Sequence, residues 1–105
     1  MNIFLDDARD APEGAFLIRP NCISVLYLLA PICTSISFDH DLGLEPNGKE
    51  YPSGYDVLKN LEKMVYTKNL WEEGAPELFV HSANPVGVER MLQVIQSIYR
   101  KVGKK

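Results

Sequence analysis

The sequence has little cysteine, no excess of positive charge and no apolar segment of membrane-spanning length. Cys22 and Cys33 are the only cysteines. Two are too few for a disulfide framework and lack the spacing of a metal site, so we expect two buried thiols in a reducing cytoplasm. The net charge of −3 argues against binding to extended nucleic-acid backbones or to anionic membranes. A small polar site could still accept a nucleotide through a metal ion.

The longest mainly apolar stretch, residues 23–33, is shorter than the roughly 20 residues that a membrane-spanning helix needs. The first residues show no basic segment ahead of an apolar one, as a signal peptide would. We therefore expect a soluble, cytoplasmic protein. With 46% hydrophobic and 24% charged residues in a chain of 105, the composition predicts one globular domain over residues 1–105.

Short apolar runs alternate along the chain with segments of helical pattern. Strands are expected at residues 2–5, 16–19, 32–38 and 78–80. Helices are expected at residues 22–30, 54–67 and 85–102. The alternation predicts an α/β fold, in which a short four-stranded and mostly parallel sheet is flanked by helices on its faces.

Capping residues mark where the expected helices begin. Ser53 and Asp56 have the spacing of a capping box, with Asp in place of the usual Glu. Asn84 can cap the last helix ahead of Pro85, and Asn21 can cap the first. These residues place the start of each helix shortly after a loop.

Polar clusters follow three of the four expected strands and are absent from the opposite strand ends. Right-handed crossovers bring the carboxyl ends of parallel strands to one rim, and ligands bind along that rim in open α/β sheets. The sequence therefore predicts a binding site there. The clusters are Asp6 and Asp7 after the first strand, Asp39, His40 and Asp41 after the third, and His81, Ser82 and Asn84 after the fourth.

Four aspartates of these clusters, Asp6, Asp7, Asp39 and Asp41, offer oxygen ligands for a divalent cation. Mg²⁺ and Mn²⁺ prefer such ligands and usually keep water or substrate phosphate in their remaining positions. Carboxylates gathered at one rim also repel one another unless something positive binds among them. The alternative, without a metal, is that Asp6 or Asp7 caps a turn while Asp41 accepts hydrogen bonds from loop amides.

Two histidines could transfer a proton at a phosphate held near the cation. An unperturbed imidazole titrates at about pH 6.5, which suits a general acid or base. His81 is the preferred candidate, and His40 and Asp39 complete the candidate catalytic set. In the alternative interpretation, His81 orients a carboxylate and His40 packs beneath the loop that follows it.

Ser82, Asn84 and Arg9 are the candidate phosphate-binding residues. Ser82 could donate a hydrogen bond to phosphate or only cap a turn. Asn84 could cap the last helix and still meet a phosphate at that helix N-terminus. Arg9 could balance phosphate charge across the rim or could be a solvated loop residue. Residues 44–52 have the composition of a mobile loop and, beside the acidic rim, could form a lid.

Several motifs together resemble known families over nearly the whole chain. They are LDDAR at residues 5–9, SFDHDLG at 37–43, SGYDVL at 53–58 and HSANPVG at 81–87. The broader resemblance is to the response-regulator receiver domain, and the narrower one is to the receiver-derived cyclic-phosphate processing receiver domains. The receiver's fifth strand, with its lysine, and its first helix have no counterpart here. The resemblance therefore implies a truncated flavodoxin-like, or receiver-like, fold.

The resemblance also implies roles for single residues. Asp6 and Asp7 would form the acidic pair that holds magnesium, Asp39 would be the phosphate-accepting aspartate, and Ser82 would contact phosphate. The implied activity is a metal-dependent phosphoesterase, a hydrolase that processes cyclic or terminal phosphates of small nucleotides or RNA ends. A receiver-like phosphoacceptor or phosphate-sensing module without catalysis stays open, as does an interaction domain with an acidic rim.

Overall fold

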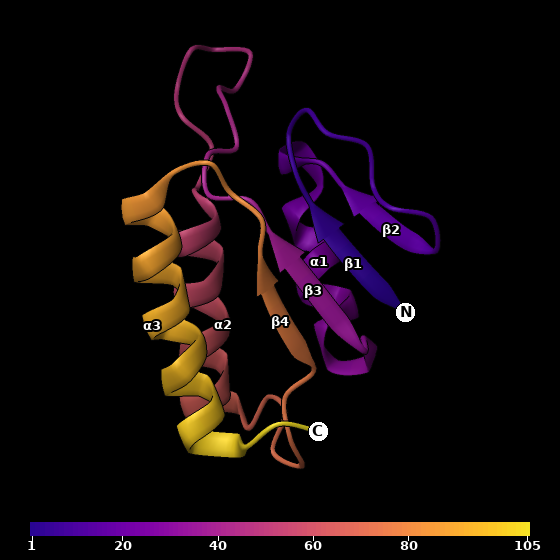
Figure 1. The fold of residues 1–105 in the computed structure, drawn as a ribbon, viewed down its shortest axis with the longest axis vertical. Helices are drawn as coiled ribbons and strands as arrows, with labels where there is room; N and C mark the ends of the chain where they lie inside the picture. Colours follow the sequence, from indigo (N-terminus) through magenta and orange to yellow (C-terminus); the bar gives the residue numbers. More distant parts are fainter.

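The computed structural model describes all 105 residues and contains one sheet and three α-helices (Figure 1). All strand pairings are parallel and the strand order is β2-β1-β3-β4. The predicted α/β class, with a truncated receiver-like arrangement, is confirmed. The strands are β1 Asn2–Leu5, β2 Ala15–Ile18, β3 Ser35–Phe38 and β4 Glu77–Val80, and the helices are α1 Ile23–Leu29, α2 Gly54–Lys68 and α3 Pro85–Val102.

The two long helices begin where their capping residues predict. The Ser53 hydroxyl accepts a hydrogen bond from the Asp56 backbone N–H at 3.1 Å, and the Asp56 carboxylate accepts one from the Ser53 N–H at 2.9 Å. The Asn84 side chain accepts a bond from the Gly87 N–H at 3.0 Å. Each bond satisfies a donor of the first turn that has no partner within the helix. Both predicted caps are confirmed.

The first helix forms within one residue of its predicted bounds, as α1 Ile23–Leu29, but the predicted cap at Asn21 is wrong. Pro20–Cys22 forms a 3₁₀-helix, so Asn21 lies inside a turn and Cys22, without a side-chain cap bond, precedes α1. A second 3₁₀-helix, Ala30–Ile32, follows α1, and β3 therefore begins later than the apolar run that starts at residue 32. Proline fixes φ near the value that helical turns use, which favours such a turn at each of these points.

All three helices lie on one face of the sheet, whereas helices were expected on both faces. Both helical crossovers, from β2 to β3 through α1 and from β3 to β4 through α2, run in the same direction across the sheet. Right-handed connections then place α1 and α2 on the same side, and α3 packs against α2. The connection from β1 to β2 is a loop without a helix, so nothing covers the second face. Figure 1 shows the strands in front of α1 with no helix before them.

Burial along the strands follows this one-sided cover. Ile3, Leu5, Ile36 and Phe38 are almost fully buried toward the helices, while Phe79 on the other face is half exposed. The buried side chains belong to one hydrophobic core of 21 residues. Alternation of buried and exposed side chains is the pattern of a sheet with one solvated face, and it is unusual for parallel strands.

The two thiols differ in their exposure. Both cysteines are free, but only Cys33 is buried and Cys22 is exposed, so the expectation of two buried thiols is wrong for Cys22. Burial raises the pKa of the Cys33 thiol to about 11. None of the helices combines the length and the apolarity that crossing a bilayer requires.

Candidate metal and phosphate site

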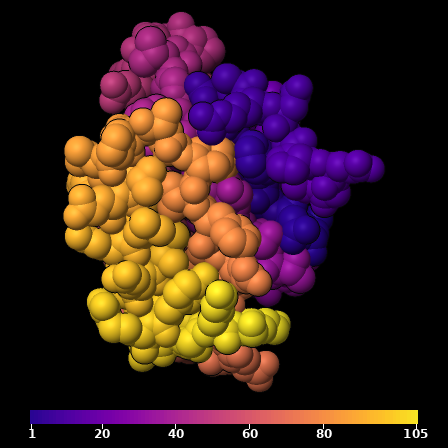
Figure 2. All heavy atoms as spheres, viewed as in Figure 1, coloured from indigo at the N-terminus to yellow at the C-terminus, as the bar shows by residue number.

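Three of the four candidate aspartates meet at the carboxyl end of the sheet. β1 and β3 are neighbours, and Leu5 pairs with Phe38, so the residues that follow these strands emerge side by side. One carboxylate oxygen from each of Asp6, Asp7 and Asp39 lies within 4.8 Å of the others. Figure 2 shows the loops after β1 and β3 and the start of α3 meeting at this end of the molecule.

Asp6 is buried and held by its neighbours. Its Oδ1 accepts hydrogen bonds from the backbone N–H groups of Ala8 and Arg9, both at 2.8 Å, and its Oδ2 lies 2.9 Å from Nε2 of His81. Burial by itself would raise the pKa of this carboxyl. The two backbone bonds and the contact with His81 outweigh that effect, so the pKa of Asp6 is lowered and its charged form is favoured.

Asp39 is also buried, but its surroundings have the opposite effect. Burial, and then the negative charge of Asp6, raise its pKa, and Asp7 adds to the rise. A hydrogen bond from the His40 backbone N–H to Oδ1 at 2.8 Å offsets only part of this. The fold therefore holds an ionised carboxylate beside one that resists ionisation, which is the electrostatic situation that a cation relieves.

The free oxygens of this cluster suit a hard divalent cation. Asp39 Oδ2 and both carboxylate oxygens of Asp7 make no hydrogen bond within the chain, and no buried side-chain oxygen is left without a partner, so these atoms face solvent. Three carboxylates with open lone pairs form the kind of oxygen-rich donor set that Mg²⁺ and Mn²⁺ use. Asp6, Asp7 and Asp39 could thus hold such an ion together.

His81 lies on the uncovered face of the sheet with both ring nitrogens engaged. Its ring stacks on Phe4, with centroids 4.0 Å apart and planes 9° from parallel. Nδ1 lies 2.6 Å from the Ser37 hydroxyl and Nε2 contacts Asp6. Because a carboxylate only accepts, Nε2–H donates to Asp6 and Nδ1 accepts from Ser37. This geometry favours the interpretation in which His81 orients a carboxylate over one in which it transfers a proton.

His40 has one engaged and one free nitrogen. Its Nδ1 lies 2.8 Å from Oδ1 of Asp41, while Nε2 makes no hydrogen bond within the chain. The ring packs against the first turn of α3, since a Cβ on Gly87 would lie only 2.5 Å from its Cδ2. Asp41 is exposed and does not belong to the group of three carboxylates, so the structure brings it to His40 and not to the cluster.

The candidate phosphate-binding residues lie at the start of α3 and after β1. The Ser82 hydroxyl oxygen accepts a bond from the Asn84 N–H at 3.2 Å, which leaves its O–H free to donate. The Asn84 side-chain oxygen caps the helix, and its amide NH₂ makes no bond within the chain. Arg9 donates from Nη1 to the backbone carbonyl of His81 at 2.9 Å and lies 3.8 Å from Oδ2 of Asp6.

Three supporting residues were missed from the sequence. Ser37 and Phe4 face the uncovered side of the sheet beneath His81, and Arg19 donates from Nη1 to the backbone carbonyls of Asp6 at 3.3 Å and of Arg9 at 2.9 Å. The position of Ser37 in the strand, two residues before Asp39, was the only sequence signal for any of them. Strand order and register decide the other contacts.

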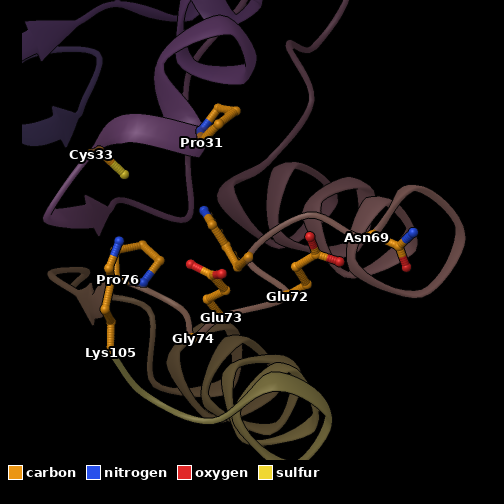
Figure 3. Close-up of a pocket in the computed structure, with 9 residues that line it drawn as sticks. Pro31, Cys33, Asn69, Glu72, Glu73, Gly74, Pro76 and Lys105 are labelled. Carbon is orange, nitrogen blue, oxygen red and sulfur yellow. The ribbon is translucent and has the colours of Figure 1, made fainter.

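The loop after β3 projects beyond the sheet beside this cluster (Figure 1). A short antiparallel bridge between Leu44 and Glu50 gives it the form of a hairpin. A separate cavity of about 290 Å³ lies at the opposite end of the sheet and is lined by Cys33, Trp71 and Lys105, among others (Figure 3). It contains none of the candidate site residues.

Comparison with known proteins agrees with the motifs. A family model described as cyclic-phosphate processing receiver domain matches residues 1–97 of this chain. The match covers every candidate site residue. Searches of curated proteins and of solved structures found no match to the chain.

Proposed function

This chain belongs to the cyclic-phosphate processing receiver domains, and on that premise we propose that it is a metal-dependent phosphoesterase. Its substrates would be cyclic or terminal phosphates of small nucleotides or RNA ends. The observation that carries this proposal is the cluster of Asp6, Asp7 and Asp39, in which one carboxyl has a lowered and another a raised pKa. Such opposed environments are typical of sites that handle charge.

Asp6, Asp7 and Asp39 would hold one Mg²⁺ or Mn²⁺ ion. A cation bound there neutralises charge on the substrate phosphate and orients it. Asp6 is already fixed by Ala8, Arg9 and His81, so its carboxylate presents its remaining lone pairs without further ordering.

Donor groups around the cluster would hold the remaining phosphate oxygens. The Ser82 hydroxyl and the Asn84 amide NH₂ both have hydrogens without a partner in the chain and lie next to the N-terminus of α3. Helix N-termini favour anions because their N–H groups and dipole point toward the ligand. The Arg9 guanidinium adds positive charge beside Asp6.

We assign proton transfer to His40, because its Nε2 makes no hydrogen bond within the chain whereas both ring nitrogens of His81 are engaged. The Asp41 carboxylate accepts from Nδ1–H, so in the neutral ring Nε2 carries the free lone pair. In opening of a cyclic phosphodiester, a water oxygen would bond to phosphorus while Nε2 takes a proton from that water. The bond from phosphorus to one ribose oxygen breaks, and the imidazolium returns its proton to that oxygen. His81 would act as a positioning residue for Asp6.

The test is hydrolysis of 2′,3′-cyclic and terminal-phosphate substrates with Mg²⁺ or Mn²⁺. Asp39→Asn should lose phosphoesterase activity, and His40→Gln should lower kcat at unchanged folding. Glu13→Gln, which changes an exposed carboxylate in the loop between β1 and β2, is the control and should keep full activity. Absence of turnover by the metal-loaded wild-type protein with every such substrate would refute the proposal.

A receiver-like phosphoacceptor is the second candidate. It is favoured by the free Oδ2 of Asp39, which is the atom that would bond to phosphorus while the donor's P–O bond breaks. Labelling of Asp39 by acetyl phosphate, with no release of inorganic phosphate beyond slow hydrolysis of the label, would support this function instead.

A further inference from the structure

A cleft of about 240 Å³ lies along the hairpin loop after β3. Its lining includes His40 and Asp41 from the start of the loop, and Leu44, Glu50 and Tyr51 from the hairpin. Gly43 joins the cleft to the cluster, because a Cβ at this glycine would lie 3.2 Å from Oδ2 of Asp7. A ligand whose phosphate lies at the cluster would therefore place its adjoining group in this cleft.

Backbone hydrogen bonds fix the walls of the cleft. The Tyr51 N–H donates to the Gly43 carbonyl at 3.0 Å, and the Glu45 N–H donates to the Lys49 carbonyl at 2.7 Å. The Tyr51 side chain packs against the hydrophobic core, while the Leu44 residue is 64% exposed. In the absence of a ligand, the cleft thus has one aromatic residue held by the core, Tyr51, and one solvent-exposed apolar residue, Leu44.

The charges along the cleft decide what it can accept. Asp41 and Glu50 contribute two carboxylates, and no lysine or arginine lines it. A second phosphate placed here would meet negative charge with no cation to offset it. An uncharged group with an apolar face and hydrogen-bonding edges fits better, because Tyr51 can cover the face and the carboxylates can accept from N–H or O–H groups.

We propose that this cleft is a nucleoside subsite, which holds the base and ribose attached to the phosphate at the acidic cluster. The inference rests on the proposed function and assigns the part of the molecule that holds the nucleoside of its substrates. The preferred substrates are mononucleotides and the terminal nucleotide of an RNA.

Paired substrates test the subsite separately from the chemistry. Adenosine 2′,3′-cyclic phosphate carries a base, and methyl riboside 2′,3′-cyclic phosphate presents the same reacting group without one. The wild-type protein should show a KM about 5- to 150-fold lower for the nucleotide, the range that one base-stacking contact gives. Tyr51→Ala and Leu44→Ala should reduce that ratio toward one, with the KM for the methyl riboside unchanged.

Matched controls replace exposed residues of the same type elsewhere. Tyr66→Ala and Leu28→Ala, both in helices away from the cleft, should keep the wild-type ratio. Equal KM values for the two substrates in the wild-type protein would overturn the subsite while leaving the phosphoesterase intact. If neither substrate is hydrolysed, the phosphoesterase proposal fails. Binding of adenosine 3′-monophosphate in the presence of Mg²⁺, measured by calorimetry, would then still test the subsite. Binding that Tyr51→Ala weakens and Tyr66→Ala does not would support it. No binding by the wild-type protein, or equal binding by the wild-type protein and Tyr51→Ala, would refute it.

Discussion

Replacing Asp39 with asparagine should stabilise the metal-free protein while removing its response to metal. Asp39 is buried beside Asp6 and Asp7, and both its burial and these charges raise its pKa. Above that raised pKa, the folded protein therefore carries a charge on Asp39 that is less favourable than the same charge in the unfolded chain. Asparagine keeps the shape and the Oδ1 acceptor for the His40 N–H but carries no charge.

The size of the effect follows from the separation of the charges. One carboxylate oxygen of each of Asp6, Asp7 and Asp39 lies within 4.8 Å of the others. Two unit charges at that limiting separation repel by about 3.5 kcal/mol at an effective dielectric constant near 20 and by about 0.9 kcal/mol in water. Asp39 is nearly buried and Asp7 is exposed, so we expect Asp39→Asn to raise the free energy of unfolding by about 1 to 3 kcal/mol. A domain of this size gains roughly 4 to 8 °C in Tm for each kcal/mol.

The pH dependence has a definite sign. Because the pKa of Asp39 is higher in the folded protein than in the unfolded chain, protonation of Asp39 stabilises the folded state. This stability is fully present below the ordinary pKa of the carboxyl, near 3.8, and is lost as the pH rises through the raised pKa. The advantage of Asp39→Asn should therefore be largest above the raised pKa of Asp39 and shrink as the pH falls through it toward the ordinary value.

Urea unfolding in EDTA, and then in Mg²⁺, measures both parts of this prediction. At a metal concentration ten times Kd, the wild-type protein should gain about 1.4 kcal/mol, and Asp39→Asn should gain far less. Glu13→Gln, at an exposed carboxylate, should match the wild-type protein in both conditions. An Asp39→Asn variant less stable than wild type in EDTA at pH 7 would show that charge repulsion within the cluster does not control the stability of this site.

Three further substitutions test the supporting structure by urea unfolding. His81→Ala removes the stack on Phe4 and the bond to buried Asp6, and should cost about 2 to 4 kcal/mol. Gly54→Ala would place a Cβ 1.9 Å from the Asp39 carbonyl oxygen and should cost more than about 4 kcal/mol or prevent folding. Ser53→Ala removes the cap of α2 and should cost about 1 kcal/mol. A loss below about 0.5 kcal/mol in any of the three would contradict the contact assigned to it.

The gathering of the acidic residues could be predicted from the sequence because it depends on few assumptions. Asp6 and Asp39 each follow an apolar run, and parallel strands end at a common rim. Their direct contact also requires β1 and β3 to be neighbours. The caps of α2 and α3 could also be predicted, since Ser53 and Asn84 each accept a hydrogen bond from a residue only three positions away. Local patterns and handedness suffice for such features.

Features that depend on strand order could not be predicted in this way. The contact between His81 and Ser37 requires β4 to lie beside β3, and the stack on Phe4 requires β1 to be the next strand. The same order puts both crossover helices on one face, against the expectation of helices on both. A single sequence does not contain that order, so the role of His81 stayed open between proton transfer and support of a carboxylate.

The contrast between Asp6 and Asp39 links the one-sided fold to the proposed chemistry. Because no helix covers the second face of the sheet, His81 can lie flat over Phe4 and reach Asp6 from that side. This contact, with the two backbone bonds, keeps Asp6 ionised, and its charge is one reason that Asp39 resists ionisation. A bound cation would therefore relieve most repulsion at Asp39, the carboxyl whose charged form the fold disfavours. Loss of His81 should therefore weaken metal binding even though His81 would not touch the metal.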